Sequence, residues 1–181
     1  MLPVINTGFC ATFSRFFLIT LFSQSRKFPV SYSKNMDNTV KSLGSGLFGA
    51  LALNVINEVA RQYVPGAPRL DVVGKKGLAK AFQMSGATPP QGENLYWGAL
   101  VGDVVSNALY YSLVGTNKGK NAWQKGAILG LASGVSTLIL PRFFGAGDAV
   151  NRKPQTQAMT VAWYVLGGLA AALAIKALSK K

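Results

Sequence analysis

The chain has 181 residues, of which 49% are hydrophobic and 14% are charged, whereas soluble domains carry about 25% charged residues. Basic residues outnumber acidic residues by 19 to 6, histidine is absent, and Cys10 is the single cysteine. Acid–base chemistry on histidine, metal or haem sites built from His or several Cys, and disulfides within the chain are therefore excluded. Phosphate-loop, nucleophile-elbow and zinc-protease motifs are also missing from the sequence. We expect no catalytic residue, no cofactor, no metal site and no enzymatic activity.

The charged residues fall mostly between long apolar runs, a pattern typical of membrane-spanning helices. Such a helix needs about 20 residues, because each residue adds about 1.5 Å to a hydrocarbon core about 30 Å thick. The candidate spans are residues 43–64, 95–115, 122–140 and 156–178. The sequence thus predicts an all-α, polytopic membrane protein with four transmembrane helices packed through small residues. Its basic loops suit anionic lipids as partners. Nucleic acid is not expected as a partner, because the basic residues form no stripe interleaved with aromatics.

Residues 1–35 differ from the rest of the chain in having five serines, four basic residues and no acidic residue. Three interpretations compete for this N-terminal extension. The first is a secretory signal that uses the short apolar run 16–22, but no clear cleavage site follows this run. The second is a transit peptide, for which the stretch is rather apolar. The third interpretation, which we favour, is that translation starts at Met36. That start leaves 15 basic and 6 acidic residues.

The first predicted span, 43–64, has two halves of different character. Gly46 and Ala50 are separated by four residues, a spacing that lets two helices approach closely in lipid. Further along, polar residues at steps of three and four share one narrow helical face. These residues are Asn54, Asn57, Glu58 and Arg61. The polar face can line the interior of the bundle, or this half of the helix can rise out of the bilayer, where polar residues cost little.

A polar connection separates the first two spans. The residues Pro-Gly-Ala-Pro at 65–68 should end the first helix, since proline disfavours helix both at its own position and at the preceding residue. Asp71 can then cap a short basic helix that runs to about Gln83. A proline-rich turn at 88–92 leads into the central span.

The central span, 95–115, carries Asp103 near its middle. A charged side chain at this depth costs roughly 2.5 to 3.5 kcal/mol, so Asp103 should face protein or water and be paired or protonated. The candidate cations are Arg61, Arg69 and Arg142. Ser106 and Asn107 extend the polar face, and Gly98 with Gly102 forms a second four-residue step of small residues. Aromatic residues near both ends, Tyr96 and Trp97 at one and Tyr110 and Tyr111 at the other, suggest interfacial positions. Both a functional site and a structural pairing remain open for Asp103.

The last two spans contain the strongest packing signals. Gly126, Gly130 and Gly134 form two successive GxxxG steps in the span 122–140, and Gly167 with Gly168 marks close-packing surfaces in the span 156–178. Small residues at this spacing are typical of helices that pack backbone to backbone.

Charge gives only a small preference for orientation. With four spans, seven basic residues counted from Met36 fall on the side of the termini and eight on the other side. Short loops and tails weigh more in the positive-inside rule, which favours cytoplasmic termini. We expect an integral protein of a bacterial inner membrane.

The stretches Ala67-Pro68-Arg69-Leu70-Asp71 and 159–164, followed by Gly167-Gly168, give the chain a likeness to a known group. It resembles small uncharacterised bacterial membrane proteins of about four helices, over roughly residues 36–178. The resemblance implies a location in the membrane and no activity, so no functional residue is carried over from it.

Three functions fit this sequence. The favoured hypothesis is a structural or accessory membrane protein that forms a homo-oligomer or joins a larger complex, because glycines lie on several helix faces. The alternative is a small cation- or proton-coupled transporter or channel that uses Glu58 and Asp103. A lipid-modifying enzyme built on the same carboxylates ranks third.

Overall fold

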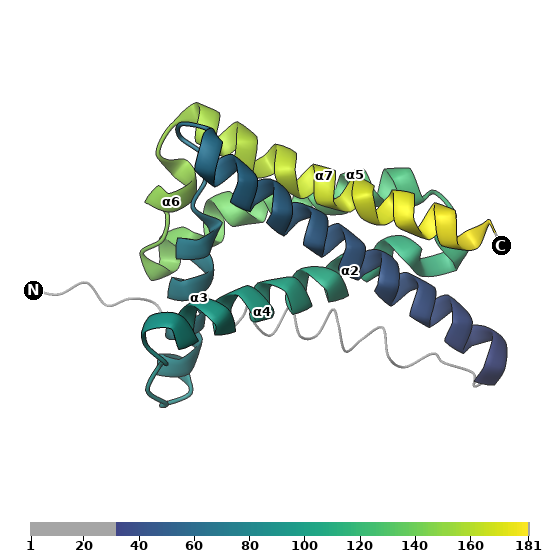
Figure 1. Cartoon of the computed structure of the whole chain (residues 1–181), viewed down its shortest axis with the longest axis horizontal. Coiled ribbons are helices and arrows are strands. Elements are labelled where there is room, and N and C mark those ends of the chain that lie inside the picture. The colour runs from purple at the N-terminus through teal and green to yellow at the C-terminus, as the bar shows by residue number, and fades with distance from the viewer. Residues whose placement is uncertain (1–31, 181) are drawn as a thin grey trace, which may run out of the picture. The chain divides into compact units, whose positions relative to one another are not determined.

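The computed structural model describes residues 32–180, and these residues form helices joined by short turns, with no β-strand among them (Figure 1). The predicted all-α fold is confirmed. Our interpretations of the N-terminal extension fall almost entirely on residues outside the described part. The α-helices are α2 (Tyr32–Tyr63), α3 (Leu70–Met84), α4 (Gly92–Ser112), α5 (Ala122–Ile139), α6 (Asp148–Asn151) and α7 (Pro154–Ser179); the 3-10 helices are η2 (Leu113–Gly119) and η3 (Leu140–Phe144).

Three helical segments of the described chain are long and apolar enough to cross a membrane: Asp37–Tyr63, Ala122–Phe144 and Pro154–Ser179. This agrees with an integral membrane protein. The helix α4, predicted as a fourth span, is not among the three. Its apolar run is interrupted by polar residues, Asp103, Ser106 and Asn107 among them.

The helix α2 begins at Tyr32, well before the first predicted span, which begins at residue 43. Residues 32–42 are mostly polar and carry no apolar periodicity, so the sequence signal started only at Leu43. In the structure the helix extends through them, and Lys41 Nζ lies 2.7 Å from Asp37 Oδ2 one turn before it. Such pairs at four-residue spacing stabilise an exposed helix turn.

The helices α5 and α7 pack antiparallel through a seam of glycines. Gly126 lies against Gly168, Gly130 against Tyr164, and Gly134 against Val161. A Cβ atom added at Gly130 would lie only 2.6 Å from the carbonyl oxygen of Tyr164. The two backbones therefore touch, and van der Waals contact along this seam takes the place of the hydrophobic effect that lipid cannot supply.

The helix α2 also runs antiparallel to α7. Near the middle of α2, Gly49 lies against Gly167 and Ala171, and just beyond its end the carbonyl of Gly66 accepts a hydrogen bond from Thr156 Oγ1 at 2.7 Å. The buried core lies between these helices and η2; it includes Leu53, Tyr111, Val114, Trp163, Tyr164, Ala171 and Ile175.

The helix α4 crosses α2 in the opposite direction. Gly46 of α2 lies against the backbone of Ala108 and Ser112, close to the end of α4. Further along, Asn54 of α2 reaches Asp103 of α4. Away from this crossing the two helices diverge, as Figure 1 shows, and α3 packs against the first half of α4 through Leu78 and Gly98.

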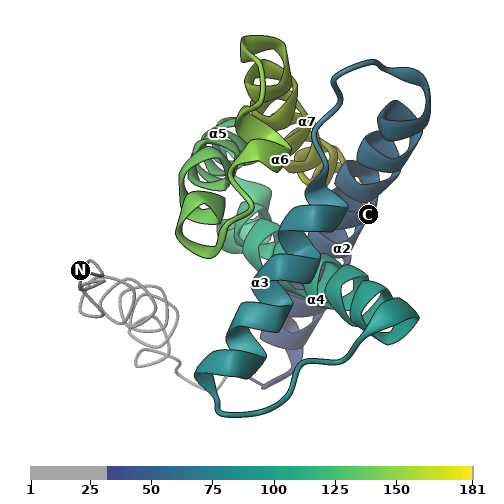
Figure 2. The same cartoon turned by 90° about the vertical axis from the view of Figure 1, so that its left-hand side faces the viewer.

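The short helices α3 and α6 gather at one end of the bundle, the end that faces the viewer in Figure 2. The connection between α2 and α3 is fixed there, because Arg69 N donates to the carbonyl oxygen of Ala149 at 2.9 Å and Pro68 is fully buried. Asp71 does not cap α3 as expected. The helix starts at Leu70, and Asp71 lies within its first turn, paired with Arg69 and Lys75.

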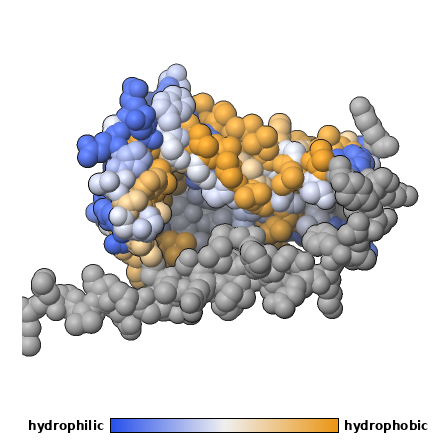
Figure 3. Space-filling view, turned by 90° about the horizontal axis from the view of Figure 1, so that it is seen from below, coloured by the Kyte–Doolittle hydropathy of each residue, from blue (hydrophilic) through white to orange (hydrophobic). Residues whose placement is uncertain are grey.

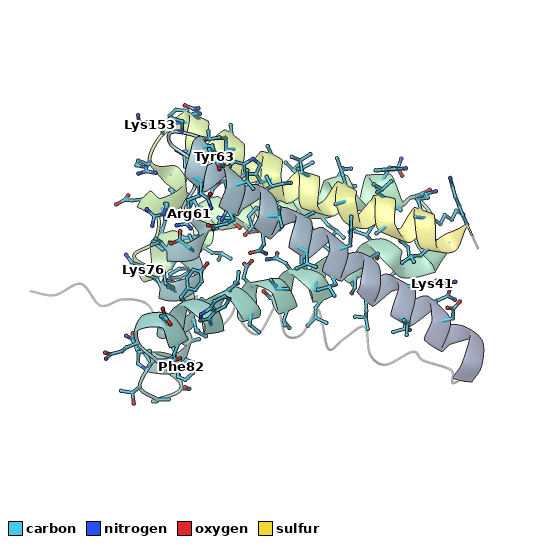
Figure 4. All side chains as sticks on the ribbon, in the orientation of Figure 1. Lys41, Arg61, Tyr63, Lys76, Phe82 and Lys153 are labelled. Carbon is cyan, nitrogen blue, oxygen red and sulfur yellow. The ribbon has the colours of Figure 1, made fainter. Side chains whose placement is uncertain are left out.

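Polar and apolar residues are separated along the bundle. On the face shown in Figure 3, hydrophilic residues gather at the end that holds α3 and α6, and hydrophobic residues cover the stretch beside it. In Figure 4, Arg61, Lys76 and Lys153 lie toward this end, and Lys41 lies toward the opposite one. Polar ends with an apolar band between them are the distribution that a bilayer favours.

Candidate intramembrane polar site

Asp103 lies between α2 and α4 and is held by two amide side chains. Asn54 Nδ2 donates to Asp103 Oδ2 at 3.0 Å, and Asn107 Nδ2 donates to Asp103 Oδ1 at 3.0 Å. Each carboxylate oxygen thus has one neutral donor. We call these three residues the Asp103 cluster.

Local geometry explains how the chain builds this cluster. Asn107 follows Asp103 by one helical turn, so both side chains lie on the same face of α4. Its amide also donates to the main-chain carbonyl of Asp103 at 3.0 Å, which fixes its orientation. Asn54 comes from α2, which approaches α4 because Gly46 carries no side chain at the crossing. Its amide is fixed in the same way by the carbonyl of Ala50 at 3.0 Å.

None of the three arginines proposed as partners pairs with Asp103. Arg61 instead binds Glu58 on its own helix, with Nη2 2.5 Å from Oε1 and Nε 3.1 Å from Oε2. Arg69 pairs with Asp71, and Arg142 donates to Asn151. Within the described part of the chain, Asp103 therefore forms no salt bridge. Each arginine finds a partner close in sequence at the end of the bundle, whereas Asp103 lies near the middle of α4.

The other polar residues of the two helices take separate roles. Asn57 is buried, and its Oδ1 accepts no hydrogen bond from the residues that the structure describes. Ser106 is exposed and donates to the main-chain carbonyl of Asp103 at 3.1 Å. Glu58 is occupied by Arg61 and by Gln62. The predicted polar faces of α2 and α4 are thus brought together at Asn54 and Asp103 but not at Glu58.

The small residues predicted for helix packing fall into two groups. Most lie against another helix of the same chain; these are Gly46, Ala50, Gly98, Gly126, Gly130, Gly134, Gly167 and Gly168. Gly102 differs, because it is exposed and a Cβ added there would meet nothing within 4 Å. The small residues therefore mainly mediate packing between helices of the same chain.

The buried position of Tyr111 was not predicted from the sequence. Expected at the interface, it is fully buried, and its hydroxyl donates to the carbonyl oxygen of Tyr164 at 2.7 Å. Its hydroxyl also lies 3.1 Å from the position of a Cβ at Gly167, so the missing side chain makes room for the ring. The pairing of an aromatic on one helix with a glycine on another carries no signal along a single sequence.

Comparisons with protein-family models, with curated proteins and with solved structures found no match to this chain.

Proposed function

We propose that this protein is an integral membrane protein of four spans that couples transport to protonation of Asp103. The directions of the helices support the fourth span. Because α2 and α5 both run antiparallel to α7, α2 ends and α5 begins at opposite ends of the bundle. The chain between them has to return across the bilayer, and α4, antiparallel to α2, makes that return.

The surface of α4 supports its place in lipid. Large apolar residues are exposed along it at steps of four, which places them on one side of the helix. They are Trp97, Val101, Val105 and Leu109, and Leu113 continues the row at the start of η2. Asp103 and Asn107 lie on the other side, toward α2. Two of the polar residues of α4, Asp103 and Asn107, thus face protein, as an amphipathic membrane helix requires.

The observation that carries the transport proposal is a carboxylate near mid-helix with two amide donors and no cation among the described residues. A charged carboxylate in the bilayer is costly, and two neutral amides offset only part of that cost. Such a group changes protonation when its exposure to water changes. It therefore serves as a proton-binding site that alternates with the conformation of the bundle.

Amide and charged side chains of α2 lead from this cluster toward one end of the bundle. Asn57 lies one turn beyond Asn54, and Glu58 and Arg61 follow at the end near α3. In the opposite direction the close crossing at Gly46 and the buried ring of Tyr111 close the bundle. A proton would reach Asp103 from the end that holds α3.

The test is proton uptake by proteoliposomes that hold a pH-sensitive dye, driven by a potassium diffusion potential. We expect uptake by the native protein and its loss, about tenfold or more, in Asp103→Asn, which keeps the shape of the side chain but cannot be protonated. Glu58→Gln is the matched control. It also removes one carboxylate, yet Glu58 pairs with Arg61 outside the cluster, so uptake should be largely kept.

Labelling with a carbodiimide that reacts with protonated carboxyl groups in apolar surroundings provides a second readout. Asp103 should be modified in the native protein, increasingly as the pH is lowered. Equal proton uptake by the native protein and Asp103→Asn, or the absence of modification at Asp103 at every pH, would contradict the proposal.

A second function is favoured by the outer face of α4. Gly102 is open on that face beside Val101 and Val105, where a companion helix could approach the backbone closely. We propose on this ground an accessory subunit that joins a larger membrane complex or a homo-oligomer. The same experiment separates the two functions. Uptake indifferent to Asp103→Asn, with a companion retained in mild detergent, would leave the accessory function.

A further inference from the structure

Three arginines from separate parts of the chain line one pocket at the end that holds α3 and α6. Arg61 comes from the last turn of α2, Arg69 precedes α3, and Arg152 follows α6. The pocket has a volume of about 310 Å³, at the lower end of the range of about 300 to 1,000 Å³ that is usual for ligand sites. It suits a small ligand or the headgroup of a larger one.

The charge of this pocket is positive. Its lining, as far as residues 32–180 form it, contains no carboxylate. Glu58 and Asp71 balance Arg61 and Arg69 from outside the pocket, with N–O distances of 2.5 and 3.1 Å. Among the residues that the structure describes, Arg152 has only a long contact, from Nη2 to the carbonyl oxygen of Ala67 at 3.4 Å. Its guanidinium is therefore free to donate to an added anion, and that anion would also meet the two paired guanidinium groups.

The wall of the pocket is held in place by the fold. Residues 65–68 turn sharply, and Gly66 adopts a φ of +80°, which other residues rarely take. Thr156 Oγ1 fixes the carbonyl of Gly66, and Ala149 fixes the amide of Arg69. A site with a fixed backbone loses little conformational freedom when it binds.

The pocket lies where a candidate membrane span ends, which bears on the kind of ligand it would take. The candidate span of α2 ends at Tyr63, and the exposed side chains of Tyr63 and Val64 also line the pocket. An aromatic and an apolar side chain beside three guanidinium groups correspond to the level of lipid headgroups. Arginine is the usual partner of phosphate, because its planar fork donates two hydrogen bonds at once.

We propose that the Arg61–Arg69–Arg152 pocket binds a phosphate group, supplied by the headgroup of an anionic membrane phospholipid. The choice of lipid rests on the membrane placement proposed above. A soluble phosphate would use the same hydrogen bonds, so the experiment distinguishes the two sources.

The test uses the full chain purified in neutral detergent and titrated with short-chain phosphatidylglycerol. Phosphatidylcholine of the same chain length controls for the acyl chains, and inorganic phosphate tests the soluble source. We expect Arg152→Ala to weaken binding of phosphatidylglycerol about tenfold or more, as is typical for loss of a charge-assisted hydrogen bond. Arg152→Lys should bind phosphatidylglycerol with an affinity between those of the native protein and Arg152→Ala, because lysine keeps the charge but not the planar fork of hydrogen-bond donors.

Lys80→Ala is the matched control. It removes one positive charge from an exposed position of α3 that does not line the pocket, and it should leave binding nearly unchanged. Equal weakening by Arg152→Ala and Lys80→Ala, or no binding of either probe, would overturn the proposal. Inorganic phosphate that binds as tightly as the lipid would keep the phosphate site and assign it to a soluble ligand. Release of the native protein from membranes by alkaline carbonate would instead contradict the membrane placement alone.

Discussion

Asp71 joins two basic side chains at the start of α3. Arg69 Nε donates to Asp71 Oδ1 at 3.1 Å, and Lys75 Nζ lies 3.5 Å from Oδ2. Burial raises the pKa of Asp71, but the hydrogen bond from Arg69 and the charges of Arg69, Lys75 and Arg61 together outweigh burial and hold this pKa below its usual value. The hydrogen bond with Asp71 in turn raises the pKa of Arg69. The ionised pair therefore stabilises the junction between α2 and α3.

At neutral pH, Asp71→Asn should lower the free energy of unfolding by about 1 kcal/mol, the upper value for a partly exposed ion pair. Because the pKa of Asp71 is lower in the folded state than its unfolded value of about 3.9, this stabilisation is complete above that pH and is lost as the pH falls through the folded-state pKa. Melting temperatures in detergent should therefore converge for the native protein and the variant as the pH falls below about 4.

Asp37→Asn serves as the control for this effect. Asp37 also pairs with a lysine, Lys41, but its side chain is 63% exposed, and water screens such a pair strongly. We expect little change in melting temperature at any pH. A difference between native protein and Asp71→Asn that stayed constant at acidic pH would show that the carboxylate does not stabilise the fold through its charge.

The seam between α5 and α7 depends on the absence of side chains. At Gly130, a Cβ would lie 2.6 Å from both the carbonyl oxygen of Tyr164 and the Cα of Val165. Those atoms belong to the backbone of a helix and cannot move aside singly. Gly130→Ala should therefore separate the helices and destabilise the fold by about 1 to 3 kcal/mol, the usual cost of overpacking. This cost is measured by unfolding the protein in detergent and monitoring the loss of the helical circular dichroism signal.

Gly102→Ala provides the matched comparison on α4. It is the same substitution within a helix, but at a position where a Cβ meets nothing within 4 Å. Alanine favours helix over glycine by up to about 1 kcal/mol, so stability should be unchanged or slightly increased. Equal destabilisation by both substitutions would mean that the glycines act through helix propensity or lipid contact rather than through the seam.

At the scale of elements, the sequence predicts helices better than it predicts their partners. Apolar runs located α4, α5 and α7 to within about three residues, since burial in lipid or protein requires such runs. The polar start of α2 was not predicted, because its residues show no apolar pattern. Asn107 could be placed beside Asp103 from one helical turn. Asn54 could not, because its contact depends on where α2 and α4 cross, and that crossing is set by Gly46 on one helix and Ala108 on the other.

The whole molecule is organised by the direction of its helices. Three segments satisfy the length and hydropathy of a membrane span, and their directions are those that the fourth passage proposed above, between α2 and α5, would connect. The apolar stripe of α4 faces outward, and the Asp103 cluster faces α2. Mean hydropathy averages over both faces of a helix and therefore understates a span that carries a polar site on its inner face.

This passage can be tested by labelling single cysteines with a membrane-impermeant maleimide in sealed vesicles of known orientation. In a chain with Cys10 replaced by serine, we expect Lys80→Cys and Lys120→Cys to be labelled from opposite sides, because α4 lies between them and both positions are exposed. Lys180→Cys should be labelled from the same side as Lys120→Cys, since α5 and α7 cross in opposite directions between those positions. Labelling of positions 80 and 120 from one side would place α4 outside the bilayer core. The Asp103 cluster would then lie in water, where a carboxylate needs no protonation to be stable, and the basis for proton coupling would be lost with it.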